Sequence, residues 1–101
     1  MYYVYILRCE NSSLYTGITT DVERRFNEHK DGSIKGAKYT KTHKPLGVEA
    51  VWECNSKIDA SKLEYRIKKL PKSEKEELIL SSEGTLKLVI GDYECLFKRL
   101  L

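Results

Sequence analysis

The segment LYTGITTDVERRFNEH, residues 14–29, brings four chemically useful residue types into one short strand–turn–helix stretch. Arg25 and His29 are four residues apart, so on a helix they lie along one stripe. A guanidinium is always charged and offers a fork of donors that suits an anionic group such as phosphate. An imidazole can donate or accept a proton near neutral pH. Tyr15 adds a hydroxyl, and Gly17 permits a close approach because it has no Cβ. These residues are therefore a candidate site for an anionic ligand.

Each of these residues also has an ordinary structural explanation. Arg25 can be a solvated helix arginine that pairs with Asp21, four residues earlier. His29 near the end of a helix can interact favourably with the helix dipole. Gly17 within a strand can mark a β-bulge. The residue types alone leave both interpretations open.

The charge distribution is more informative than the net charge of +3. Lysine and arginine gather in two stretches, residues 30–44 and 66–75, each of which contains a single acid. Such stretches can follow a phosphate backbone. They can also form an ordinary solvated lysine face.

Composition excludes several classes of protein. A chain of 101 residues with 41% hydrophobic and 33% charged residues fits one globular domain with a modest core. The apolar N-terminus, MYYVYILRC, is soon interrupted by Glu10 and is typical of a strand rather than a signal peptide. No apolar run approaches the ~20 residues that span a bilayer, so we expect a cytoplasmic protein without a membrane partner. Three widely spaced cysteines, with no Cys-x-x-Cys, indicate neither a disulfide framework nor a thiolate zinc site.

Local patterns predict the elements that must position the candidate site. YYVYILR, residues 2–8, is apolar on both faces and is therefore expected to be a central strand. A turn follows, and residues 14–18 are the returning strand of a hairpin. Thr20 and Glu23 match a capping box, which predicts a helix that starts there and ends at residues 31–32.

The remaining chain continues this alternation of helices and strands. We expect a Lys-rich connection at residues 31–46 and a third strand at residues 47–54. Two helices should follow, one from residue 59 or 61 to about residue 70 and one at residues 74–80. Residues 81–101 form a tail. The tail contains TLKLVI, a strand pattern, and YECLFKRLL, a strand or short helix, with no predicted place in a sheet. The predicted fold is α+β: a small three-stranded antiparallel sheet flanked by helices, in the order β-β-α-β-α-α. Residues 1–80 are expected to form the domain, and residues 81–101 the tail.

Two tripeptides resemble the motif that names the GIY-YIG nuclease superfamily. They are Tyr-Val-Tyr at residues 3–5 and, nine residues later, Tyr-Thr-Gly at residues 15–17. Arg25 follows the motif glycine by eight residues, and His29 follows Arg25 by four. Glu64 lies on a later predicted helix, after the third strand. Five elements at consistent spacing make this resemblance specific.

The resemblance covers roughly residues 1–80 and is closest to the small single-domain bacterial YhbQ-like (Slx1-type) group. GAKYT, residues 36–40, and the segment 64–70 also resemble that group. The chain departs from the pattern in having tyrosine for the first motif glycine and valine and threonine for the motif isoleucines. An asparagine that some members use after the glutamate has no counterpart here.

The resemblance implies phosphodiester hydrolysis with one divalent metal ion. Glu64 would be the ligand of Mg²⁺ or Mn²⁺; the alternative is a surface glutamate paired with Lys68. Tyr5 would be the general base or would orient the attacking water. Because a free tyrosine has a pKa near ~10, a nearby cation would have to lower it, and Arg25, Lys38 or the metal are candidates. The alternative for Tyr5 is a half-buried core tyrosine.

The resemblance assigns roles to the other candidate residues as well. Arg25 would clamp the scissile phosphate, and His29 would donate to that phosphate or accept a proton from the water. Tyr15 would lie near Tyr5. Substrate contacts are expected from Gly17, Lys38 and Tyr39.

Three functions compete at this point. The first is a Mg²⁺- or Mn²⁺-dependent DNA endonuclease, structure-directed or weakly specific, in DNA repair or recombination, with RNA as an alternative substrate. The second is a non-catalytic nucleic-acid-binding module that retains the fold. The third is a protein-interaction domain in which the apolar tail docks a partner or forms a dimer.

Overall fold

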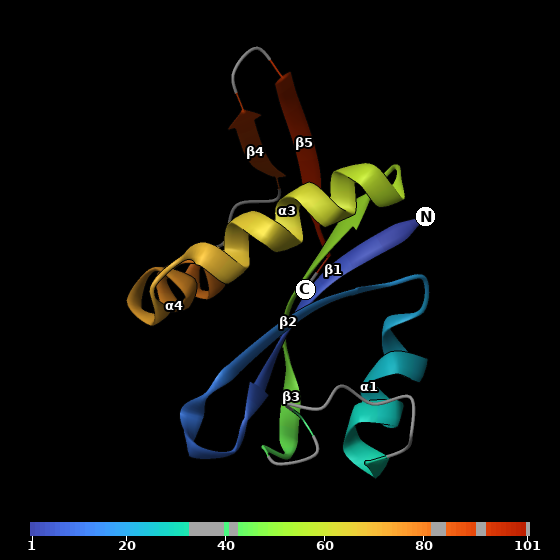
Figure 1. The fold of residues 1–101 in the computed structure, drawn as a ribbon, viewed down its shortest axis with the longest axis vertical. Coiled ribbons are helices and arrows are strands. Elements are labelled where there is room, and N and C mark those ends of the chain that lie inside the picture. The colour runs from blue at the N-terminus through green and yellow to red at the C-terminus, as the bar shows by residue number, and fades with distance from the viewer. Residues whose placement is uncertain (33–39, 41–42, 82–84, 91–92, 101) are drawn as a thin grey trace.

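The computed structural model describes residues 1–32, 40, 43–81, 85–90 and 93–100, and for residues 85–90 and 93–97 it describes the backbone alone. The chain forms an α+β fold (Figure 1). Its elements are, in order, β1 (Tyr2–Cys9), a 3-10 turn (Glu10–Ser12), β2 (Leu14–Thr19), α1 (Val22–Asp31), β3 (Pro45–Cys54), α3 (Lys57–Lys69), α4 (Lys72–Leu80), β4 (Thr85–Ile90) and β5 (Tyr93–Arg99). None of the described helices is long and apolar enough to cross a membrane.

Within the described part of the chain, the sheet has five strands in the order β2-β1-β3-β5-β4, with antiparallel pairing throughout. The predicted count of three strands is therefore wrong. The three predicted strands are present, but β5 adds to the free edge of β3 through the pairs Trp52↔Arg99 and Glu53↔Lys98. β4 then pairs with β5, and the hairpin that they form projects beyond α3 at the top of Figure 1.

Strand β1 is central, as its two apolar faces predict, and it lies between β2 and β3. Its alternating side chains supply two separate cores. On one face, Val4 and Ile6 pack with Trp52 of β3 and with Leu63 and Ile67 of α3. On the other face, Tyr5, Leu7 and Cys9 pack with Val51 and with Val22 and Phe26 of α1. The sheet therefore separates α3 from α1, and β1 contributes to both layers.

Helix α1 begins one residue later than the predicted capping box. Asp21, not Thr20, is the N-cap, and its carboxylate accepts a hydrogen bond from the Arg24 amide at 3.1 Å. The Asp21 amide donates a hydrogen bond to the Thr19 hydroxyl at 3.1 Å, which keeps Thr20 in the turn before the helix. At the other end, Gly32 adopts the left-handed conformation with φ 65° and closes the helix as predicted.

Helix α3 starts earlier than predicted because Ser56, rather than Asp59 or Ser61, caps it: the Ser56 hydroxyl accepts from the Asp59 amide at 3.1 Å. Helix α4 is tied to the sheet by Arg8 of β1, whose guanidinium donates to both carboxylate oxygens of Glu76, at 2.6 and 2.5 Å. Arg99 of β5 donates to the carbonyl oxygens of Ile79 and Leu78 at the end of α4, at 2.7 and 3.2 Å. These arginines place the tail and α4 against the predicted three-stranded sheet.

Candidate active site

The Tyr5 side chain lies across the neighbouring strand at Gly17. The two residues are partners in the β1–β2 register, and Tyr5 is 1% exposed. A Cβ on Gly17 would lie 2.5 Å from Tyr5 Oη, which is closer than real Cβ atoms come to other heavy atoms. It would also lie 3.2 Å from the ring of Tyr15. Gly17 therefore permits a close approach, as predicted, and the approaching group is the Tyr5 phenol. A direct substrate contact of Gly17 stays a prediction.

A chain of hydrogen bonds leads from this phenol into the protein. Tyr5 Oη lies 2.8 Å from His29 Nε2, and His29 Nδ1 lies 2.7 Å from the Thr40 hydroxyl. His29 is 1% exposed and Thr40 is buried. Tyr15 completes the cluster, with its ring centroid 5.1 Å from the His29 ring and 6.3 Å from the Tyr5 ring. The last turn of α1 thus supplies a buried histidine rather than a solvated one.

Burial sets the protonation of Tyr5. Burial raises the pKa of this phenol well above its ordinary value of 10.0, and the neighbouring Tyr15 raises it further, whereas Arg25 lowers it. Arg25 thus lowers the pKa of Tyr5 in the predicted direction, but the effect of burial is larger and the net shift is upward; the predicted effects of Lys38, which lies outside the described residues, and of the metal stay predictions. Tyr5 is a neutral phenol near pH 7, able to donate one hydrogen bond and accept others.

The same burial keeps His29 neutral. Burial lowers the pKa of His29 to about 4, and the positive charge of Arg25 acts in the same direction. A neutral imidazole has one donor and one acceptor nitrogen. If Nδ1–H donates to Thr40, Nε2 accepts a hydrogen bond from the Tyr5 hydroxyl. In the other tautomer, Nε2–H donates a hydrogen bond to Tyr5. The tautomer of His29 therefore sets the direction of both hydrogen bonds, the one to Thr40 and the one to Tyr5.

The low pKa of His29 predicts that folding stability falls as the pH drops from about 6.5 to about 4. Below pH ~6.5 the histidine binds a proton in the unfolded chain but not in the folded protein, so unfolding is favoured. The full difference amounts to ~3 kcal/mol, reached near pH 4 and not regained below it. Urea unfolding at several pH values measures it. His29→Gln should flatten the dependence and His43→Gln should leave it; equal dependence in all three proteins would contradict the prediction.

Arg25 and Glu64 bring opposite charges to this cluster. Arg25 Nη1 lies 3.1 Å from Glu28 Oε1, so its ion-pair partner is Glu28; Asp21, the partner considered from the sequence, caps the helix instead. The Glu64 side chain on α3 is 23% exposed and lies 3.6 Å from Lys68 Nζ, the pair anticipated from their spacing.

Glu64 acts electrostatically on the same site from the other layer. Burial has the largest effect on the pKa of Tyr15 and raises it. Arg25 lowers this pKa, and Glu64 raises it. Glu64 also adds to the rise in the pKa of Tyr5. The predicted residues Tyr5, Tyr15, Gly17, Arg25, His29 and Glu64 are therefore brought together. Lys38 and Tyr39 lie outside the described residues, and their substrate contacts stay predictions.

A match to a protein family identifies the kind of domain that contains this arrangement of residues. The family described as the GIY-YIG catalytic domain matches residues 1–77. The chain belongs to the GIY-YIG family. A UPF0213 protein of Fusobacterium nucleatum is 46% identical over 86 residues, which cover 85% of this chain and 84% of that protein. A UPF0213 protein of Halalkalibacterium halodurans is 47% identical over 83 residues, covering 82% and 86%.

A solved structure supports the same assignment. The solution NMR structure of the UPF0213 protein BH0048 from Bacillus halodurans is 46% identical, covers 83% of this chain and 88% of that one, and gives a TM-score of 0.52. The relatives are UPF0213 proteins, and the finer YhbQ-like (Slx1-type) grouping stays a prediction. The GIY-YIG catalytic domain is a nuclease domain, so the resemblance on residues 3–5 and 15–17 is confirmed at the level of the family.

The GIY-YIG site has a donor set that fits a hard divalent cation. Glu64 is a partly exposed carboxylate beside the tyrosine cluster. Among the described residues, no three His, Cys, Asp or Glu side chains gather as a metal cage would require. Mg²⁺ is commonly held by one or two carboxylates, with water and substrate phosphate completing the shell. Glu64 therefore fits a Mg²⁺ or Mn²⁺ ligand of that kind.

Two residues of the GIY-YIG site were missed in the sequence. Glu28 is three residues after Arg25, a spacing that brings side chains together on a helix, and this signal could have identified it. Thr40 lies in the GAKYT segment but bonds to a histidine eleven residues earlier. No local periodicity relates these two positions, so Thr40 could be recognised only in the folded protein.

Proposed function

We propose that this chain is a Mg²⁺- or Mn²⁺-dependent endonuclease that hydrolyses DNA phosphodiester bonds. The observation that carries the proposal is the buried Tyr5–His29 hydrogen bond, with Arg25 and Glu64 acting electrostatically on the same tyrosine. A cation, a carboxylate and a polarised hydroxyl meet the needs of phosphoryl transfer: charge neutralisation, metal binding and orientation of water.

Tyr5 and His29 orient the attacking water and receive its proton. With Nδ1–H directed at Thr40, the Nε2 atom of His29 accepts the hydrogen of the Tyr5 hydroxyl. A lone pair of Tyr5 Oη then accepts a hydrogen bond from the water. As the water attacks phosphorus, its proton passes to Tyr5 Oη and the phenol proton passes to His29 Nε2; the negative charge that builds up on the phosphate stabilises the imidazolium that burial alone disfavours. Two neutral groups can relay the proton, so no free phenolate is needed.

Arg25 binds the non-bridging oxygens of the scissile phosphate. Glu28 holds the guanidinium through Nη1, and the five N–H donors of a guanidinium allow it to pair with a carboxylate and with a phosphate oxygen at the same time. A divalent ion at Glu64 would neutralise charge on the phosphate and on the leaving oxygen. Recognition of DNA shape and a role in repair or recombination are the further parts of this proposal, and they rest on the GIY-YIG family alone.

Cleavage of labelled DNA tests this proposal. Duplex, single strand, flap and junction DNA, and an RNA duplex, are incubated with Mg²⁺, Mn²⁺ or EDTA. We expect cleavage that requires the metal and is strongest on a branched DNA. Arg25→Ala should lower kcat ~10²-fold because it removes charge stabilisation in the transition state. Arg24→Ala, the matched control on the same helix, should alter KM at most.

The possible negative results distinguish the competing functions. A wild-type protein that binds DNA and cuts none of these substrates would be the non-catalytic module. One that neither binds nor cuts would contradict a nucleic-acid function altogether. A partner or dimer contact through residues 81–101 stays a prediction, as does a cytoplasmic location.

A further inference from the structure

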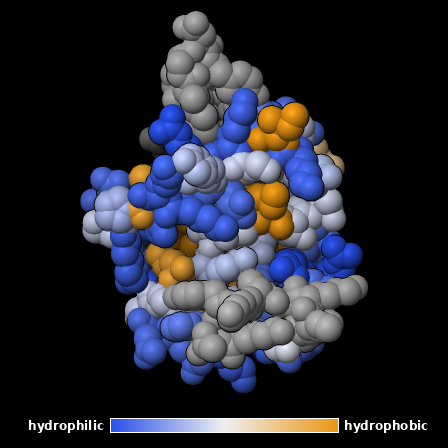
Figure 2. Space-filling view, viewed as in Figure 1, coloured by the Kyte–Doolittle hydropathy of each residue, from blue (hydrophilic) through white to orange (hydrophobic). Residues whose placement is uncertain are grey.

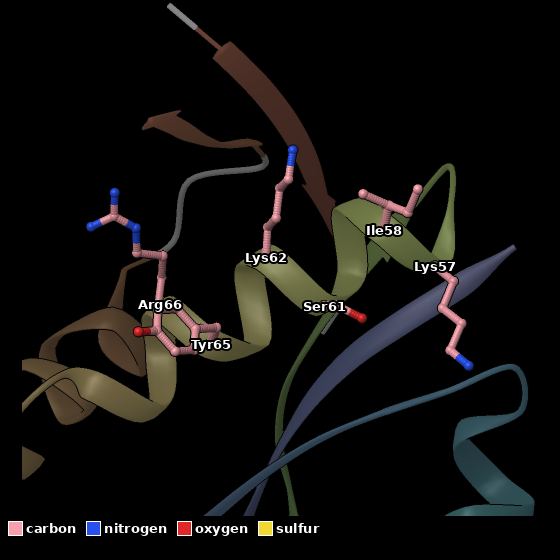
Figure 3. Close-up of a pocket in the computed structure, with 6 residues that line it drawn as sticks. All are labelled: Lys57, Ile58, Ser61, Lys62, Tyr65 and Arg66. Carbon is pink, nitrogen blue, oxygen red and sulfur yellow. The ribbon is translucent and has the colours of Figure 1, made fainter. Parts of the chain in front are cut away.

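Helix α3 has an apolar groove on the side turned away from the sheet. It buries Ala60, Leu63 and Ile67, yet Ile58 and Tyr65 are 68% and 58% exposed. These two residues are seven apart and therefore lie on one face of the helix. They line a hollow of ≈ 600 Å³ together with Lys57, Ser61, Lys62 and Arg66 (Figure 3), which we call the α3 groove.

The α3 groove combines exposed apolar surface with positive charge. Three of its described lining residues, Lys57, Lys62 and Arg66, are cationic and none is acidic. Lys69 adds a fourth cation, with Nζ 4.5 Å from the centre of the Tyr65 ring. Figure 2 shows the same mixture on the face that α3 crosses, where apolar side chains in orange are surrounded by hydrophilic ones in blue.

This combination matches the chemistry of an unpaired nucleic-acid strand. Such a strand carries one negative charge per nucleotide and exposes flat bases that stack on aromatic rings. A duplex keeps its bases stacked inside, so only its phosphates could use the groove. An acidic peptide could pair with the cations, but its carboxylates would not stack on the exposed ring of Tyr65.

The α3 groove also adjoins the proposed active site. Glu64, the proposed metal ligand, immediately precedes Tyr65. Lys57 lines the groove and also a second hollow that contains Arg25 and Glu28. Figure 3 shows the Lys57 side chain extending from the first turn of α3 toward β1 and β2. A strand held by Arg25 can therefore continue past Lys57 onto Tyr65.

We propose that the α3 groove binds an unpaired strand next to the scissile phosphate, with a base stacked on Tyr65 and the backbone held by Lys57 and Arg66. The proposal rests on the proposed nuclease function and names its substrate class: DNA with a single-stranded extension beside the cut.

Binding in EDTA, where no cleavage takes place, tests the groove directly. The probes are a DNA duplex and the same duplex with an oligo-dT extension; an oligo-U extension distinguishes RNA from DNA as the source of the strand. The wild type should prefer the extended probe. Tyr65→Ala should weaken binding of that probe about 10-fold and leave the plain duplex unchanged, because stacking is lost. Tyr65→Phe keeps the ring and should bind as the wild type does.

Two further variants separate stacking from charge. Arg66→Ala should reduce the slope of log affinity against log salt by about 0.7, the value for one phosphate contact on a single strand. Leu80→Ala, at an apolar side chain on α4 that is more exposed than Tyr65, is the matched control and should change nothing. Equal binding of the extended probe by the wild type and Tyr65→Ala would overturn the proposal, as would equal competition by polyglutamate and oligo-dT.

The outcomes also separate this proposal from the proposed function. If the wild type cleaves DNA in Mg²⁺ and Tyr65→Ala has the same kcat and KM on an extended substrate, the groove proposal fails and the nuclease function stands. If the wild type neither binds nor cleaves any probe, both fail. Thermal melting of Tyr65→Ala should match the wild type, because the side chain is mostly exposed.

Discussion

Glu64→Gln is expected to lower the rate of DNA cleavage by ~10³-fold and to leave DNA binding in EDTA unchanged. Glutamine has nearly the same shape as glutamate, so the packing of α3 is preserved. It lacks the negative charge that binds a hard cation, and metal-ion stabilisation of a phosphoryl transition state contributes several kcal/mol. Cleavage rates measured over a series of Mg²⁺ concentrations check this.

The direction of the pKa effects makes this experiment decisive. The charge of Glu64 adds to the rise in the pKa of Tyr5 and of Tyr15. Removing that charge therefore makes both phenols more acidic, which would favour transfer of the Tyr5 proton to His29. If Glu64 acted only through the tyrosines, the variant would cleave at least as fast as the wild type, and that result would contradict a metal-ligand role. Glu77→Gln on α4 is the matched control.

Gly17→Ala is expected to lower kcat ~10²-fold and to destabilise the fold by ~1–3 kcal/mol. The new Cβ would lie 2.5 Å from Tyr5 Oη and 2.7 Å from Tyr5 Cζ, so the phenol must move. Tyr5 is buried between β2 and α1 and has little room to move, which is why overpacking here costs stability. The shift also breaks the 2.8 Å contact with His29, and a displacement of about 1 Å in a catalytic group can cost ~10² in rate.

Gly47→Ala is the matched control, because a Cβ there would meet no atom of the described residues within 4 Å. Urea unfolding and steady-state kinetics should place Gly47→Ala with the wild type. The double variant Tyr5→Phe/Gly17→Ala adds a second check: removing Oη relieves the closest clash, so the two losses of stability should be less than additive. Additive losses, or full activity in Gly17→Ala, would show that the strand tolerates a side chain at this position.

The sequence by itself determined the local elements and the order of the candidate residues. Apolar alternation in residues 2–8 and the turn after them are enough to form the β1–β2 hairpin, and that register sets Tyr5 opposite Gly17. The spacing of residues 3–5, residues 15–17 and Arg25 was enough to suggest the family that residues 1–77 match. These features lie within the first 25 residues and arise from one hairpin and the helix that follows it, where steric and hydrogen-bonding rules between near neighbours act directly.

Only the tertiary structure decided the chemical state of the site. Arg25 and His29 occupy one helical stripe in the sequence, yet His29 is buried against Tyr5 while Arg25 reaches Glu28. Burial raises the pKa of Tyr5 and lowers that of His29, and burial depends on how α1 docks on the sheet.

The tail shows the same division between local and long-range determinants. The strand pattern of β4 was recognised, but the place of β5 depends on the edge of β3 and on Arg99, which binds carbonyl oxygens of α4 some twenty residues earlier. A strand pattern indicates that a segment can pair; it carries no information about which free edge is nearest. That choice is made by contacts between residues far apart in the chain, and the same is true of the bond between Thr40 and His29.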